Sequence, residues 1–362
     1  VVYVLERQGF IRPHMADEND KRTIYMVDMH EPLMFLHNLD TTIKEPFASN
    51  PAVLDAVEKN HKKLQIAMTK LYPGNLVLSL SSGIMYHRLV DRITALNDVP
   101  REPLVPRRLG KNMCVPFGKI LRGKVVPNTV TKTLHTDKVY EPDLNSFTIE
   151  PFPYYSPLKS QIETIKSFDR PVILVDDLVH TANRLQVLVP QLREDGIPIK
   201  KVVVGVLSGY GRDLMQCLKV PVESIYSMPN LRQWFVESTL YPFIGGDTVR
   251  REEMKVAGLQ PSINMILPYA TPRLSGCSRE ALVEFSACCI ENSRDLFQVL
   301  EAEYRKMYAK NLTLSRLSEA VILPLCPDKG SCMEYDENLA ASVYLENDLE
   351  TLWRMKEFLI KG

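Results

Sequence analysis

Two apolar runs separated by one helix-length segment constrain the fold of this chain more than any other feature. Residues 171–175 and 200–208 consist mainly of Val, Ile and Leu, and such continuous runs suit strands that are buried on both faces of a sheet. Residues 183–195, between them, carry apolar residues at three- and four-residue spacing, which predicts a helix that Gly196 ends. Strand, helix and strand in this order are typical of a parallel sheet with helices packed on it.

The same alternation extends along much of the chain. Asn50 and Pro51 predict the start of a helix, a strand follows at residues 75–80, and residues 84–97 predict a second helix. Beyond about Pro268 helical spacing dominates. We therefore predict an α/β fold with a central, mostly parallel sheet and flanking helices, plus a C-terminal helical subdomain. The predicted boundaries are an N-terminal appendage at residues 1–50, an α/β domain at 51–265 and the helical subdomain at 266–362.

The composition argues against several classes of protein. The 44 basic and 44 acidic residues give a net charge of +0, so no overall field favours nucleic acid or an anionic membrane. Seven cysteines occur without a C-x-x-C pair, which argues against a disulfide framework or a structural zinc site and indicates the reducing cytoplasm. No apolar run approaches the ~20 residues that cross a bilayer. Charged residues also come too early for a signal peptide.

The first 50 residues differ from the rest of the chain. The sequence starts VVYVLERQGF without an initiator Met, so we expect a further domain upstream in the full-length protein. A helix ending near Gly9, a polar turn at residues 15–22 and a strand at 23–29 resemble the tail of a GNAT-type acetyltransferase. An ordinary hairpin-like appendage is the alternative.

Two adjacent carboxylates, Asp176 and Asp177, follow the first apolar run. Acids at the end of a buried strand cost stability unless a ligand uses them, and ligands of open parallel sheets bind beyond the carboxyl ends of the strands. The next residues turn into a helix whose first N–H groups suit a phosphate, with Thr181 and Arg184 adding a hydroxyl and a guanidinium. Hydroxyls bound at one end and a phosphate at the other indicate a ribose 5-phosphate.

The stretch VILVDDLVHTANR resembles the PRPP-binding motif of type I phosphoribosyltransferases. The resemblance implies that Asp176 and Asp177 hold the ribose hydroxyls. The following loop would then hold the 5-phosphate through His180, Thr181, Ala182, Asn183 and Arg184. The family usually has a small residue at the position of His180 and often Gly at Ala182. His180 therefore either joins the site or points outward, and Ala182 allows the turn if its φ stays negative.

Two further segments fit the same resemblance, in the right order. Ser81, Ser82 and Gly83 follow a strand and precede a helix, as in the family's pyrophosphate loop, although a plain strand-to-helix turn has the same pattern. Residues 118–140 stand where the family has a long flexible loop. In that loop Lys132, His135 and Lys138 are candidates to neutralise the departing pyrophosphate, and a solvated hairpin is the alternative.

Aromatic residues concentrate between residues 230 and 248, where Trp234, Phe235, Tyr241 and Phe243 occur. They predict either a core between subdomains or a hood over a bound base. A second candidate turn, at residues 208–212, follows the strand at 200–208.

Other functions receive less support from the sequence. A response-regulator receiver needs a phosphoacceptor Asp at a later strand end, and the next strand ends in Ser and Gly. No strand leads into G-x-G-x-x-G, no spacing indicates a Ser-His-Asp triad, and the seven His form no metal-ligand pair such as H-E-x-x-H. His61 is expected to lie solvated on a helix.

The resemblance implies a magnesium-dependent transferase of nucleotide metabolism. PRPP and an unidentified nitrogenous base would be its small-molecule substrates, and pyrophosphate would be released. Mg²⁺ would be held through PRPP, with Asp176 or Asp177 contributing through water and no direct side-chain ligation. A homodimer is possible by analogy with the family. The alternative from another class is a module that binds PRPP or a nucleotide as a sensor without turnover.

Overall fold

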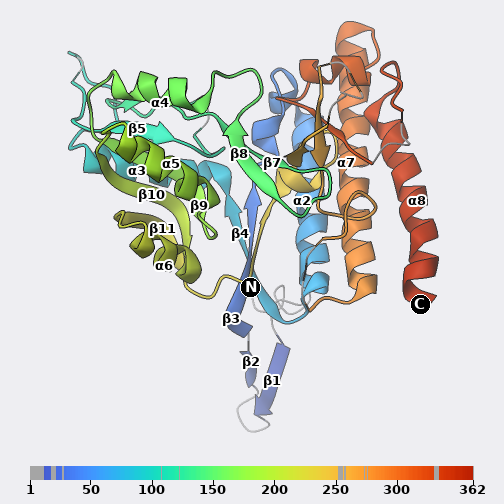
Figure 1. Cartoon of the computed structure of the whole chain (residues 1–362). Helices are drawn as coiled ribbons and strands as arrows, with labels where there is room; N and C mark the ends of the chain where they lie inside the picture. Colours follow the sequence, from blue (N-terminus) through green and yellow to red (C-terminus); the bar gives the residue numbers. More distant parts are fainter. Residues whose placement is uncertain are drawn as a thin grey trace. The chain divides into compact units, whose positions relative to one another are not determined.

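A computed structural model describes residues 12–17, 22–26, 28–106, 108–121, 123–251, 256, 258–272, 274, 276–329 and 334–361 (Figure 1). The predicted helix ending near Gly9 and much of the polar turn at 15–22 lie outside these residues. None of the helices that the structure describes is long and apolar enough to cross a membrane.

The chain forms two compact units, each assembled from separate stretches of sequence. Unit 1 comprises Val1–Ser79, Tyr140–Asn145 and Arg232–Gly362, and unit 2 comprises Leu80–Val139 and Ser146–Leu231. The predicted domain boundaries at 50/51 and 265/266 do not coincide with the limits of these units.

Unit 2 contains the predicted parallel sheet, with strand order β11-β10-β9-β5-β6 and parallel pairing throughout. Its strands are β5 (Met113–Pro116), β6 (Val130–Thr131), β9 (Val172–Val179), β10 (Ile199–Ser208) and β11 (Val222–Met228). Its helices are α3 (Ser82–Leu96), α4 (Leu158–Lys166), α5 (Asn183–Glu194) and α6 (Gly209–Cys217). The α/β prediction is confirmed.

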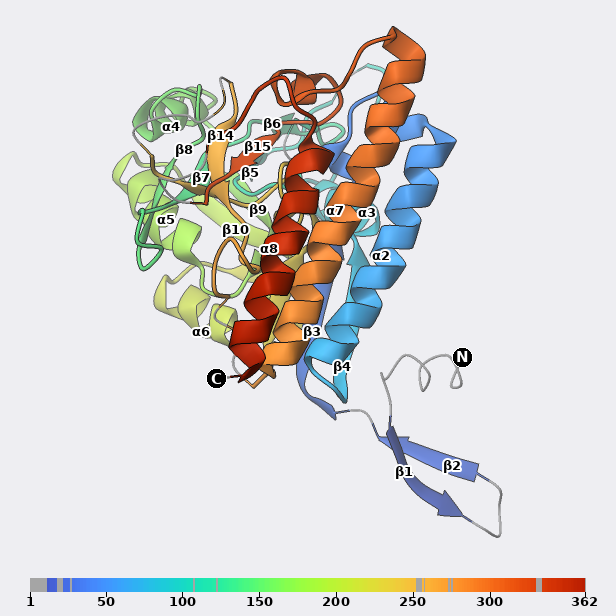
Figure 2. The same cartoon turned by 90° about the vertical axis from the view of Figure 1, so that its right-hand side faces the viewer.

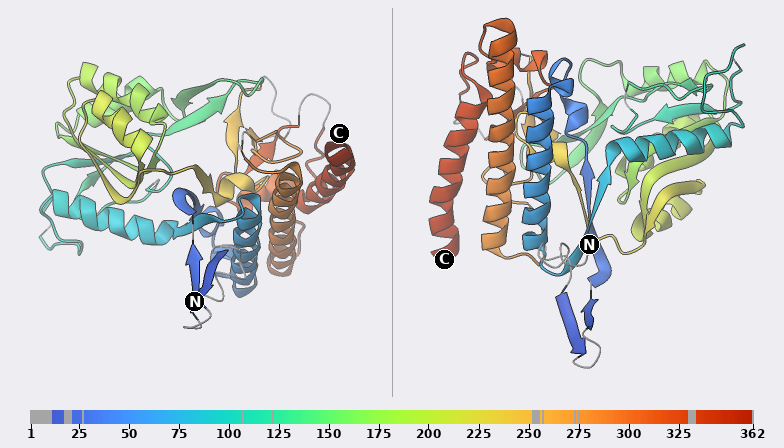
Figure 3. Two further views of the ribbon diagram at one scale, coloured as in Figure 1. Left: turned by 90° about the horizontal axis from the view of Figure 1, so that it is seen from below. Right: turned by 180° about the vertical axis from the view of Figure 1, so that it is seen from behind.

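Helices cover both faces of this sheet, which explains why β9 and β10 lack a polar side. Leu174 and Val204 join one buried cluster with Ile162 of α4 and Leu188 of α5. On the other face, α3 packs against β10 (Figure 3). Two buried faces demand apolar residues at consecutive positions, as the Val-rich runs provide.

Two local predictions in unit 2 are wrong. β9 does not stop before the acid pair but continues through Asp176 and Asp177 to Val179, because its pairing with β10 extends to Leu207. The segment at 118–140 is not one long loop, since it contains β6 and β7 (Thr136–Tyr140). Another strand, β8, spans Phe147–Pro151.

Unit 1 combines a small sheet with three long helices. The sheet has the order β12-β3-β4, with β3 at Asp28–His37, β4 at Asn75–Ser81 and β12 at Gln233–Val236. Asn50 caps α2 (Pro51–Leu71) as predicted, since its side chain accepts the N–H of Ala52 at 2.8 Å. α7 (Arg279–Tyr308) lies between α2 and α8 (Ala341–Lys361), as Figure 2 shows. The C-terminal helices therefore share their packing with the helix that begins at Pro51.

The remaining elements of unit 1 are short. They are β1 (Arg12–Asp17), β2 (Arg22–Met26), η1 (Asp40–Thr42), η2 (Phe47–Ser49), η3 (Glu237–Leu240), β13 (Asp247–Val249), β14 (Gln260–Ile263), η4 (Leu314–Glu319) and β15 (Leu325–Pro327). β1 and β2 pair antiparallel. Phe235, Tyr241 and Phe243 lie in the buried core of this unit, as the core interpretation of the aromatic segment predicts, and Trp234 is half-buried on β12. The burial of Phe235, Tyr241 and Phe243 argues against these three as a base hood.

Candidate functional site

The acid pair lies in the second half of β9, and its two carboxylates are placed differently. Asp176 is 4% exposed, whereas Asp177 is half-buried. Each carboxylate accepts a hydrogen bond from the N–H of the next residue, at 2.8 Å in both cases. These bonds hold both side chains close to the backbone of β9, and Asp177 is the more accessible of the two.

Asp176 is enclosed by Gly118 and Arg184. A Cβ atom added at Gly118 would lie 1.5 Å from Asp176 Oδ1, so only glycine leaves room for this carboxylate. Arg184 Nη1 lies 3.9 Å from Asp176 Oδ2. Burial and then the neighbouring Asp177 raise the pKa of Asp176 well above its ordinary value, and Arg184 opposes that shift. The two acids therefore interact, as a shared site requires.

The segment that follows β9 forms the predicted tight turn into a helix. Ala182 makes this turn with a φ of 50°, so it is left-handed and the condition of a negative φ does not hold. No side chain of the described residues caps α5, whereas Asn50, Ser81 and Ser208 cap α2, α3 and α6. The first N–H groups of α5 thus keep their capacity to bind an anion.

The side chains of His180, Thr181 and Arg184 in this turn differ in their hydrogen bonds. His180 Nδ1 lies 2.8 Å from Ser208 Oγ, and burial lowers the pKa of His180. Thr181 is exposed, and its Oγ1 accepts a hydrogen bond from Asn183 Nδ2 at 2.9 Å. Arg184 keeps a buried Nε that has no hydrogen-bond partner among the described residues. A buried donor without an acceptor is costly, and an anionic ligand would remove that cost.

The segment Ser81, Ser82 and Gly83 is not a loop, because β4 runs directly into α3. Ser81 is the N-cap of α3 and accepts the N–H of Ile84 at 3.5 Å. Ser82 begins the helix, and its buried Oγ has no hydrogen-bond partner among the described residues. A Cβ at Gly83 would meet only Ser81 Oγ, at 3.5 Å, so packing within the protein does not require glycine there.

Gly205 brings α3 close to the acid pair. A Cβ at this position of β10 would lie 2.1 Å from Met85 Sδ and 2.7 Å from the carbonyl oxygen of Asp177. α3 therefore crosses the sheet at the level of Asp177. The segments that start α3 and α5 share this region of unit 2.

The cationic candidates of the 118–140 segment have other neighbours. Lys132 is exposed, and its backbone N–H donates to the carbonyl of Cys114 at 3.0 Å. The ring of His135 stacks on Tyr155, with centroids 3.7 Å apart. Lys138 Nζ lies 4.2 Å from the centroid of the Phe147 ring. Their predicted role toward pyrophosphate stays a prediction.

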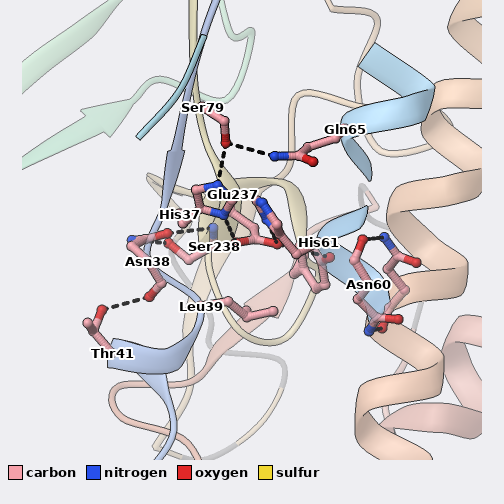
Figure 4. A network of polar contacts seen from close by, with 12 residues as sticks. His37, Asn38, Leu39, Thr41, Asn60, His61, Gln65, Ser79, Glu237 and Ser238 are labelled. Atoms are coloured by element: carbon pink, nitrogen blue, oxygen red, sulfur yellow. Dashed lines mark hydrogen bonds and ion pairs between the residues drawn. The ribbon is translucent and has the colours of Figure 1, made fainter. Parts of the chain in front are cut away.

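The sequence reasoning missed a second polar cluster, in unit 1. His37 of β3, His61 of α2 and Glu237 of η3 have ligand atoms within 4.8 Å of one another (Figure 4). His61 is predicted to be solvated, but only 16% of its side chain is exposed. Because the three residues lie far apart in the chain, no local spacing signals their proximity.

Comparisons with known proteins give a limited result. No family model matches the chain, and no curated protein matches it. Among solved structures, the chain is similar to one described as a purine phosphoribosyltransferase from Pyrococcus horikoshii Ot3. The sequence identity is 13% and the TM-score is 0.24, over 42% of this chain and 86% of that chain.

Proposed function

We propose that unit 2 is a phosphoribosyltransferase domain that binds PRPP with Mg²⁺ and transfers its phosphoribose to a nitrogenous acceptor. Two buried polar atoms give this proposal its strongest support. Ser82 Oγ and Arg184 Nε are buried polar atoms without a hydrogen-bond partner among the described residues, and each lies in a segment expected to bind PRPP. Unpaired buried polar atoms are rare in folded proteins, and a ligand that pairs with them explains both.

The 5-phosphate of PRPP binds at the start of α5 in this proposal. The uncapped N–H groups there favour an anion, and the Thr181 hydroxyl and the Arg184 guanidinium add directional hydrogen bonds. His180, whose pKa is lowered by burial, contributes a neutral ring at pH 7. The phosphate charge is therefore balanced by Arg184 and the helix, not by His180.

The ribose and the pyrophosphate take the other two segments. Asp177, the accessible acid, accepts hydrogen bonds from the ribose hydroxyls, and Asp176 accepts a hydrogen bond from the Asp177 N–H. The start of α3, with Ser81, Ser82 and Gly83, receives the pyrophosphate on backbone N–H groups and the Ser82 hydroxyl. Lys132 and His135, on the segment before β7, neutralise the charge that develops on the leaving group.

The donor set around Asp177 fits Mg²⁺, which prefers oxygen ligands and keeps several waters. Asp176 and Asp177 are the residues that would hold the ion, through water and the ribose hydroxyls. When bound, Mg²⁺ supplies neutralising charge to the pyrophosphate as it leaves.

The proposed reaction is a displacement at C1 of the ribose. A nitrogen lone pair of the acceptor forms a bond to C1, and the bond from C1 to the pyrophosphate oxygen breaks with its electron pair. The developing positive charge on the ring lies beside the acid pair, which favours it electrostatically. Any proton on the attacking nitrogen passes to solvent or to a basic group.

A thermal-shift titration with PRPP and Mg²⁺, followed by a pyrophosphate-release assay across nucleobases, tests the proposal. Wild type should gain thermal stability with PRPP and release pyrophosphate with at least one base. The double variant Asp176→Asn, Asp177→Asn should fold but lose both responses. Asp213→Asn, an exposed acid of α6, is the matched control and should behave as wild type. No stabilisation of wild type by PRPP would contradict the proposal.

The second candidate function is a sensor that binds PRPP without consuming it. The burial of Asp176, at 4% exposed, favours this reading because only Asp177 is accessible to a bound ribose, and binding alone needs less of the acid pair than turnover does. A sensor would show the thermal shift, by mass action, and no pyrophosphate release with any base.

A further inference from the structure

His37 and Glu237 are placed side by side by the register of two strands. β3 and β12 pair in parallel with Leu36 opposite Val236, so the next residue of each segment is a member of the cluster. The residues that follow, Asn38 and Ser238, are joined by two hydrogen bonds. Asn38 Nδ2 donates to Ser238 Oγ at 2.8 Å, and the Ser238 N–H donates to Asn38 Oδ1 at 2.9 Å. Both neighbours are buried, so this end of the cluster is rigid.

His61 is fixed by a similar reciprocal pair. Asn60 Nδ2 donates to the carbonyl of Asn292 at 2.7 Å, and Asn292 Nδ2 donates to the carbonyl of Asn60 at 2.9 Å. These bonds tie α2 to α7 one residue before His61. The ring of Phe35 also stacks on His61, with an angle of 13° and centroids 5.4 Å apart. All three members of the cluster are thus held by elements of unit 1.

The distances from Glu237 to the two imidazoles suit a shared ion better than hydrogen bonds, and the imidazole rings, whose centroids lie 3.0 Å apart, must move apart to hold it. Glu237 Oε1 lies 3.5 Å from His61 Nδ1, and Glu237 Oε2 lies 3.7 Å from His37 Nδ1. An N–H···O hydrogen bond prefers about 2.7–3.2 Å. A tetrahedral zinc ion with bonds of about 2.0–2.2 Å holds its nitrogen and oxygen ligands roughly 3.4 Å apart. His61 Nδ1 is buried and has no hydrogen-bond partner among the described residues, which leaves its lone pair available.

Contacts with Ser79 and Gln65 favour the tautomer of His37 that leaves its Nδ1 atom free to bind a metal. Its Nε2 contacts Ser79 Oγ, and Ser79 Oγ also accepts a hydrogen bond from Gln65 Nε2 at 2.9 Å (Figure 4). With the proton on Nε2, His37 donates to Ser79 and directs the Nδ1 lone pair toward Glu237. Ligating histidines commonly use their second ring nitrogen in this way.

We propose that His37, His61 and Glu237 form a mononuclear Zn²⁺ site in unit 1. Two imidazoles and one carboxylate are a donor set that zinc prefers, whereas Mg²⁺ and Ca²⁺ take oxygen ligands. Three protein ligands leave a fourth position for water or a small anionic ligand. The side chain of His37 is 22% exposed and that of His61 is 16% exposed, whereas that of Glu237 is 1% exposed. The fourth ligand position is therefore reached from the side of the two histidines. The site shares no residue with the proposed PRPP site.

Metal binding to the full chain tests this site. The protein is stripped with a chelator and dialysed, and Zn²⁺ binding is then measured by calorimetry. Co²⁺ replaces Zn²⁺ for a visible spectrum. Wild type should bind one Zn²⁺ per chain and give the intense absorption of tetrahedral Co²⁺. His61→Gln and Glu237→Gln should each lose at least 100-fold in Zn²⁺ affinity, because each removes a ligand.

His87→Gln is the matched control, since His87 is an exposed histidine outside the cluster, and it should bind as wild type. Ser79→Ala should weaken Zn²⁺ binding by about 10- to 100-fold, the usual effect of losing an outer-shell partner. Circular dichroism checks the fold of each variant. Glu237 is buried, so Glu237→Gln could fail to fold. In that case the comparison of wild type with His61→Gln decides the outcome. Equal Zn²⁺ affinity in wild type and His61→Gln, or no Zn²⁺ binding by folded wild type, would overturn the proposal.

Discussion

Asp176 is the residue at the candidate site whose ionisation costs most. Its carboxylate is buried beside Gly118, Asp177 and Arg184, and the charged form is favoured only by Arg184 and by the hydrogen bond from the Asp177 N–H. Because burial raises the pKa of Asp176, the folded protein retains this proton to a higher pH than the unfolded chain does. A ligand that needs the ionised acid must therefore supply favourable charge of its own, which is a role that Mg²⁺ bound with PRPP would fill.

Asp176→Asn should stabilise the protein at neutral pH. The stabilising effect of the protonated acid is complete below the unfolded pKa, about 3.9, and is lost as the pH rises through the raised folded pKa. Asparagine has no such loss, so the unfolding free energy of the variant should exceed that of wild type at pH 7.5. Urea unfolding at pH 4.5 and 7.5 measures this gap, which should widen with pH. The control is Asp213→Asn, whose unfolding free energy should equal that of wild type at both pH values. If Asp176→Asn is no more stable than wild type, or if its advantage shrinks as the pH rises, the carboxylate of Asp176 is not destabilised by burial.

At the scale of elements, the contact of α3 with β10 depends on one glycine. Gly205 lets the Met85 side chain and the Asp177 carbonyl approach the strand, and both would lie within 3 Å of an added Cβ. The Met85 side chain can move aside, but the backbone carbonyl of β9 cannot move without disturbing the sheet. Gly205 therefore sets how closely α3 lies over the acid pair.

Gly205→Ala should destabilise the protein by about 1–3 kcal/mol, the usual cost of overpacking a core. It should also weaken PRPP binding, because α3 and the Asp177 backbone must shift. Gly83→Ala, in the first turn of α3 and with room for a methyl group, should leave the unfolding free energy unchanged or raise it by about 0.5–1 kcal/mol. Thermal unfolding of the two variants gives the comparison. Equal stability of Gly205→Ala and wild type would contradict the close packing described here.

The sequence predicts the buried strands of unit 2 well, but it predicts the points where they end less well. Continuous Val and Leu runs identify β9 and β10 because burial on both faces needs no information from distant residues. The end of β9 is set by its pairing with β10, up to Leu207, so local sequence places it too early. The left-handed φ of Ala182 is likewise imposed by the strand and helix on either side, against the preference of alanine.

The candidate sites show the same contrast. The acid pair and the start of α5 are adjacent in sequence, and their chemistry is readable from one stretch. The cluster of His37, His61 and Glu237 arises from strand register and from the packing of α2 on α7, and such long-range contacts leave no signal in the spacing of residues. Gly118 beside Asp176 is a further partner that only the fold reveals.

At the scale of the whole molecule, a discontinuous unit 1 limits which pieces of the chain can fold. α2 packs on α7, and α7 packs on α8, so the core of unit 1 needs residues before 51 and after 265. Leu33 and Phe35 of β3 belong to that core, as do Leu296 and Phe297 of α7.

A fragment of residues 51–265 should therefore fail to fold as a single cooperative unit. It keeps all of unit 2 but lacks β3 and α7, which share a buried core with α2, and α8, which packs on α7. Limited proteolysis should cut rapidly within residues 51–72 and 232–265 and slowly within 80–231. The full chain should resist cleavage in all of these regions. Cooperative unfolding of the fragment with protection of α2 would show that the sequence-based boundaries describe a domain after all.

The interleaving of the two units also has a consequence for the order of events during synthesis. A ribosome releases all of unit 2 once residue 231 has emerged, while β3 and α2 still lack the partners that α7 and α8 provide. The apolar residues of β3 and α2 are then exposed on a nascent chain that already carries a complete parallel sheet. The cluster of His37, His61 and Glu237 also depends on α7, because Asn292 of α7 bonds to Asn60 beside His61, so the cluster is completed only after the parallel sheet of unit 2.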